Sequence, residues 1–153
     1  MMKNIRNKAD NDLVVTRISA LKKDSERRWG IMTVEQMLAH CSDQIRLAIG
    51  EKQPHEKPTF INRNIAKYLG LWLPRIPIKN MKAPVDMNQK YYGTLSTDIE
   101  TEKENLTSLV NAVRNFPEQK ELSAHPMFGE LNLSQWGRFM YVHIDHHLRQ
   151  FGK

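Results

Sequence analysis

Residues 136–153 read WGRFMYVHIDHHLRQFGK and predict the amphipathic helix on which the fold depends. At about 100° per residue, its apolar side chains fall on one arc. Two histidines lie inside this arc, whose members are Phe139, His143, Trp136, His147, Met140, Phe151, Ile144, Leu148 and Tyr141. The opposite side carries Arg138, Asp145, Arg149 and Gln135. A face of this kind is expected to pack against other helices.

The two histidines on the arc, His143 and His147, stand one helical turn apart. Such neighbours can bind one metal ion with both rings. The alternative is a pair of core histidines, but burying two imidazoles costs free energy unless both find polar partners. His146, at the margin of the arc, either supports the pair or lies at the surface, and a His143–His146 pair is a less central option. The segment lacks the glutamate of an HExxH motif, which argues against a metalloprotease.

A third ligand is predicted in an earlier helix. Thr33 and Gln36 form a capping box there, and the helix runs to about Ile49, with Gly50 suited to follow its last turn. His40 lies beside the apolar arc of this helix, and Gln36 and Gln44 flank it on the same side. His40 is either a boundary histidine or, if this edge faces the last helix, a metal ligand. Three neutral imidazoles with an open fourth position are typical of a catalytic metal site.

The remaining helices follow from spacing and capping signals. We expect a first helix over Asp10 to Lys23 and a short apolar helix over Thr59 to Leu73. The proline-rich stretch over residues 74–89 predicts a long connection, and such connections are often functional.

A further capping box at Thr97 and Glu100 predicts the helix that Pro117 ends. Asn132, with Gln135 three residues on, is expected to cap the last helix. The sequence therefore predicts an all-α fold, a four-helix bundle with a short extra helix and long connecting loops.

Composition limits the classes of protein. A chain of 153 residues predicts one domain over 1–153, and it has no apolar run long enough to span a membrane and no secretory signal. The lone Cys41 excludes an internal disulfide framework and is expected in the core. These features favour a cytoplasmic protein. The net charge of +6 is dispersed, which favours an anionic small-molecule substrate over nucleic acid. His55 and His125 fall in loops and are expected to face solvent.

Two stretches resemble a branch of the DinB-like superfamily, small bacterial proteins of mostly uncharacterised function. They are RWGIMTVEQMLAHCSDQ, residues 28–44, and HPMFGELNLSQWGRFMYVHIDHHLRQFG, residues 125–152. The resemblance implies an up-down-down-up four-helix bundle in which His40, His143 and His147 bind a divalent metal, with homodimers common. Residues 53–90 match no motif and are expected to lie beside the site and shape the substrate pocket.

The resemblance also suggests two classes of function. Relatives with known activity include thiol-dependent S-transferases and a maleylpyruvate isomerase, so the first hypothesis is a metal-dependent transferase that uses a low-molecular-weight thiol. Zinc, nickel or iron suits the histidine triad. Gln36, Gln150 and His146 are candidates to support the ligands or to bind substrate. The second hypothesis is a non-catalytic metal-binding or stress-response bundle.

Overall fold

The computed structural model describes residues 2–53, 93–125 and 128–153. These residues form four α-helices and no strand, which confirms the all-α prediction. The helices are α1 (Lys8–Ser19), α2 (Val34–Ile49), α4 (Ile99–Arg114) and α5 (Leu133–Gln150). No described helix is both long and apolar enough to cross a membrane.

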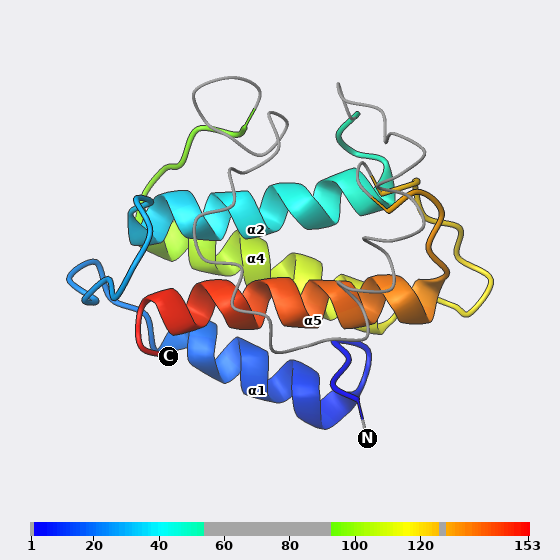
Figure 1. The fold of residues 1–153 in the computed structure, drawn as a ribbon, viewed down its shortest axis with the longest axis horizontal. Helices are drawn as coiled ribbons and strands as arrows, with labels where there is room; N and C mark the ends of the chain where they lie inside the picture. The colour runs from blue at the N-terminus through cyan, green and yellow to red at the C-terminus, as the bar shows by residue number, and fades with distance from the viewer. Residues whose placement is uncertain (1, 54–92, 126–127) are drawn as a thin grey trace.

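The four helices form an up-down-down-up bundle. Figure 1 shows α1 and α5 running in one direction and α2 and α4 running in the other. Each of α1 and α2 packs against both α4 and α5. Because α2 and α4 are parallel, the last residue of α2 and the first residue of α4 lie at opposite ends of the bundle.

The expected helix over Thr59 to Leu73, the expected connection over residues 74–89, and His55 lie outside the described residues. The same holds for the pocket-shaping role of residues 53–90, apart from Gln53 itself. The two flanks of this stretch are described, and the carboxylate of Asp43 on α2 holds both. It accepts hydrogen bonds from Lys52 Nζ at 2.7 Å and from Thr94 N at 2.7 Å and Oγ1 at 2.6 Å.

Local capping explains where α2 and α5 begin. Thr33 and Gln36 form the predicted capping box of α2, and Asn132 and Gln135 form the one of α5. Gly50 ends α2 with a φ of 80°, in the left-handed region that favours glycine.

Two predicted helix boundaries are wrong. The first helix starts after Asn7 and ends at Ser19, because Leu21 continues the apolar pattern from a turn that follows the helix. The box at Thr97 and Glu100 does not form. Asp98 caps α4, and the carboxylate of Glu102 accepts hydrogen bonds from the backbone N–H and the hydroxyl of Thr97 at 2.9 Å each.

The core is built from rows of residues four apart. On α5 the fully buried row is Trp136, Met140, Ile144 and Leu148. On α2, Met37, Cys41 and Ile45 are equally inaccessible, as predicted for Cys41. One position before each of these rows runs a second row, which contains the histidines. It consists of Gln36, His40 and Gln44 on α2, and of Phe139, His143 and His147 on α5.

Candidate metal centre

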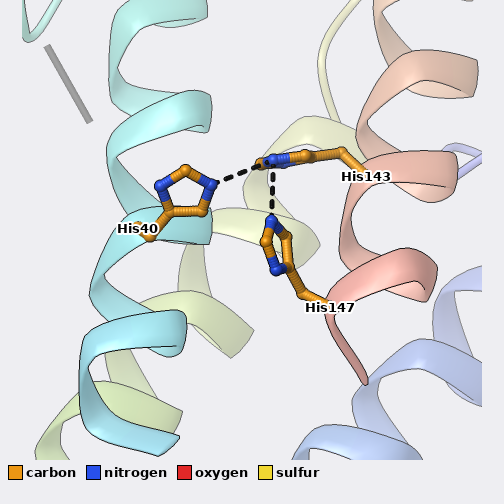
Figure 2. Close-up of side chains that lie close together, drawn as sticks. All are labelled: His40, His143 and His147. Carbon is orange, nitrogen blue, oxygen red and sulfur yellow. Dashed lines mark hydrogen bonds between the residues drawn. The ribbon is translucent and has the colours of Figure 1, made fainter. Parts of the chain in front are cut away.

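The three histidines meet between α2 and α5. Figure 2 shows His40 projecting from one helix toward His143 and His147 on the other. His40 is 3% exposed and His147 is 6% exposed, while His143 is half-buried. The second rows of α2 and α5, which contain the histidines, therefore place imidazoles where these two helices face one another.

The ring nitrogens converge on one point. His40 Nε2 and His147 Nε2 each lie 3.1 Å from His143 Nε2, and one nitrogen of each ring lies within 4.8 Å of the others. Two nitrogens bound tetrahedrally to one metal at about 2.0–2.1 Å lie roughly 3.3 Å apart. The fold therefore brings the three predicted residues together, and that they bind a metal stays a prediction.

The protons that three neutral imidazole rings can carry are compatible with a cation bound between their ring nitrogens. A neutral imidazole carries one N–H, so His143 Nε2 can donate to only one of the two nitrogens that face it. If its proton is on Nδ1, its Nε2 can only accept, and it faces another lone pair wherever the neighbouring ring also carries its proton on Nδ1. His143 Nδ1 is buried, and it has no hydrogen-bond partner within the described part of the chain. A divalent cation at the centre would accept all three Nε2 lone pairs, and neutral imidazoles suit zinc, nickel, copper or iron.

Gln150 fixes the proton of His147. Its side-chain oxygen Oε1 lies 2.7 Å from His147 Nδ1. Because a carbonyl oxygen only accepts, Nδ1 donates and the lone pair of His147 is on Nε2, at the centre. The predicted support of the triad by Gln150 has a direct contact in the structure.

The surroundings keep two of the three imidazoles, those of His143 and His147, neutral. Burial, with a smaller contribution from His40, lowers the pKa of His147 to about 3. Burial, and then the neighbouring imidazoles, hold the pKa of His143 well below its ordinary value. Metal binding near neutral pH therefore requires no proton to leave these two rings.

The two other residues predicted near the triad lie beside it. His146 is half-buried and packs its ring against that of His147, with centroids 5.1 Å apart. Its nitrogens are not part of the converging group, so a His143–His146 pair is not what the fold assembles. Gln36 Oε1 accepts from the backbone N–H of Thr33 at 3.0 Å, and a further role beside His40 stays a prediction.

His125 does not face solvent, and that prediction is wrong. Its side chain is 3% exposed, because the backbone N–H and carbonyl of His125 pair with Gly129 and the loop folds over α5. The ring stacks on Phe128 and meets Phe139 edge-on, at centroid distances of 4.4 and 4.6 Å. Phe139 in turn lies parallel to His143 at 5.7 Å. Phe128, three residues after His125, was the signal available in the sequence.

Gln44 is a second residue that the sequence did not single out. It is 1% exposed and stands one turn after His40 on α2. Among the residues that the structure describes, neither its Oε1 nor its Nε2 has a hydrogen-bond partner. An unpaired buried amide costs roughly 1–3 kcal/mol of folding free energy.

The comparisons with known proteins give a family. A family model described as "Protein of unknown function (DUF1569)" matches residues 4–153, and the chain belongs to that family. No curated protein and no solved structure matches the chain.

Proposed function

We propose that this DUF1569 protein is a metal-dependent enzyme in which His40, His143 and His147 hold one divalent cation. The observation that carries the proposal is the meeting of three Nε2 atoms, with 3.1 Å between His143 and each partner. The resemblance to the DinB-like superfamily, which shares this histidine pattern, supports it. Zinc, nickel and iron are the candidate metals.

The charge around the triad favours an anionic ligand in the fourth position. The acidic residues nearest in sequence, Asp43 on α2 and Asp145 on α5, are engaged in ion pairs with Lys52 and with Arg17 at 2.7 Å each. Among the residues that the structure describes, no carboxylate joins the group. A cation held by neutral imidazoles keeps about two positive charges, and this suits a thiolate or hydroxide.

A thiol S-transferase is the reaction that we propose for this site. When bound, the metal lowers the pKa of a coordinated thiol, which then acts as a nucleophile near neutral pH. The sulfur forms a bond to an electrophilic carbon, and the leaving group departs with its electron pair while the thiol proton passes to solvent. The chain's residues hold the three lone pairs at one point, and Gln150 keeps the proton of His147 on Nδ1.

The test begins with metal analysis of protein purified without a histidine tag. Protein loaded with zinc, nickel or iron is then mixed with bacillithiol, mycothiol or cysteine and a chromogenic aryl chloride, and loss of thiol is followed. We expect one metal per chain and thiol loss that His143→Ala abolishes. Bound metal without turnover on any pair would favour the alternative, a non-catalytic metal-binding bundle. Absence of metal binding would overturn both.

The proposal extends to oligomeric state. The superfamily resemblance implies a homodimer with a small-molecule substrate. Sedimentation velocity on the metal-loaded protein tests this point separately from activity.

A further inference from the structure

The chain segment Arg28–Gly30, between α1 and α2, packs against the last turn of α5. The backbone N–H of Arg28 donates to the carbonyl of Gln150 at 2.7 Å. Trp29 lies edge-on to His146, with ring centroids 6.1 Å apart. This segment therefore covers the end of the helix that carries two of the three histidines.

Gly30 leaves room for the side chain of Gln150. Its φ is 87°, and a Cβ atom at this position would lie 2.9 Å from Gln150 Nε2. Gln150 is 7% exposed, with its amide oxygen on His147 and its amide nitrogen against Gly30. A methyl group on residue 30 would displace the amide from this place.

We propose that Arg28–Gly30 is a positioning segment for the triad, and that it acts through Gln150 on His147. It holds the Gln150 amide with Oε1 toward His147 Nδ1, which keeps the Nε2 lone pair at the centre. If the amide turned over, its NH₂ group would donate to Nδ1 and the proton of His147 would move to Nε2. A ring in that tautomer has no lone pair for the centre.

The consequence for metal affinity rests on the proposed function, whereas the effect on the tautomer does not. Hydrogen bonds that orient ligating histidines typically change metal affinity by about 10- to 100-fold. We therefore expect that a substitution in the segment Arg28–Gly30, outside the triad, changes both the tautomer of His147 and the affinity for the metal.

Four variants separate positioning from general strain. Gln150→Leu removes the acceptor, and Gln150→Glu keeps one. Gly30→Ala adds the methyl group that meets Gln150. Gly50→Ala is the matched control, since Gly50 has a similar φ of 80° and, among the described residues, its Cβ would meet only Ser123 Oγ at 3.5 Å.

Two readouts are taken on each variant. Long-range ¹H–¹⁵N correlation spectra of the metal-free protein report the tautomer of His147, and competition with a chromophoric chelator gives zinc affinity. We expect the Nδ1–H tautomer in the parent, Gln150→Glu and Gly50→Ala. Gln150→Leu and Gly30→Ala should show mixed tautomers and zinc affinity lower by about 10- to 100-fold.

Two outcomes would overturn the inference. One is a parent-like tautomer and parent-like zinc affinity in Gly30→Ala, and the other is the same result in Gln150→Leu. A parent that shows the Nδ1–H tautomer but binds no zinc would instead contradict the proposed function and leave the positioning role standing. Thermal unfolding followed by circular dichroism verifies that each variant is folded, and Gln150→Leu keeps the test decisive if Gly30→Ala is not.

Discussion

In residues 2–53, 93–125 and 128–153 the bundle buries imidazoles in two places, and comparing them shows what distinguishes a core histidine from a candidate ligand. His125 and His147 are 3% and 6% exposed, and burial lowers the pKa of each to about 3. The backbone N–H of Phe128 donates to His125 Nδ1 at 3.2 Å. In the triad, by contrast, the Nε2 atoms face one another at 3.1 Å.

The lesson is that burial and a depressed pKa do not identify a metal ligand. The chain satisfies a ring nitrogen of His125 from its own backbone. In the triad, Gln150 directs the Nε2 lone pair of His147 toward the ring nitrogens of other imidazoles. The meeting of ring nitrogens is the feature that predicts a cation there, and the following experiments test this distinction.

The largest expected effect distinguishes the triad from the site of His125. His143→Ala should reduce bound divalent metal to background, while His125→Phe should bind metal as the parent does. The His143→Ala protein should stay helical by far-UV circular dichroism, because buried apolar rows on all four helices supply most of the burial. It should lose the metal-dependent stabilisation, about 2.7 kcal/mol at a hundredfold excess of metal over Kd. Metal binding that is unchanged in His143→Ala would show that His143 is not a ligand.

Acid unfolding gives the next effect, with His125 as the reporter. The pKa of His125 is about 3 in the folded chain against an ordinary value of 6.5, so between these values only the unfolded chain binds the proton. This contribution to stability is complete above the ordinary pKa and is lost as the pH falls toward the folded pKa. Between about pH 7.5 and about pH 5.5 it amounts to roughly 1.4 kcal/mol.

His125→Phe should therefore lose less stability than the parent over that interval, by about this amount, in urea unfolding of metal-free protein at the two pH values. The two proteins are compared by how much their free energy of unfolding changes between the two pH values. The cost of repacking residue 125 against Phe128 is the same at both pH values and therefore cancels. Equal pH dependence in the two proteins would mean that His125 is protonated or exposed in the folded state.

A third effect, similar in size to the second, concerns Gln44, whose buried amide has no hydrogen-bond partner among the residues that the structure describes. Gln44→Leu should raise the free energy of unfolding by about 1–2 kcal/mol, since leucine has a similar volume and no unpaired polar atoms. Gln36→Leu is the control and should lower it by about 0.5–1 kcal/mol, because the capping box of α2 is lost. Destabilisation by Gln44→Leu would show that the amide is satisfied in the folded protein.

Features that depend on neighbours in the sequence could be predicted. The capping boxes at Thr33 and Asn132 and the glycine after α2 are local, and the row of Phe139, His143 and His147 follows from helical spacing alone. The start of α4 was not predicted at the right residue, because Asp98 and not Thr97 is the N-cap. The side chain that bonds to Thr97 is that of Glu102 and not that of Glu100. The end of α1 was missed because Leu21 is buried from outside the helix.

Features that depend on distant parts of the chain could not be predicted. The burial of His125 depends on the contact of its loop with α2, where the backbone N–H of Ser123 donates to the carbonyl of Ala48 at 2.8 Å. The pairing of His40 with the α5 histidines was suggested by the family resemblance, since periodicity gives a face and not its partner. The contact of Gly30 with Gln150 joins residues that are far apart in the sequence, and no local pattern indicates it.

Anomalous diffraction can show whether His40, His143 and His147 bind one cation. Crystals of the untagged protein grown with zinc would be measured on both sides of the zinc absorption edge. We expect one strong anomalous peak between α2 and α5, at about 2.0–2.1 Å from the Nε2 atom of each histidine. A triad without anomalous density, at a zinc concentration that fills sites elsewhere on the protein, would contradict it.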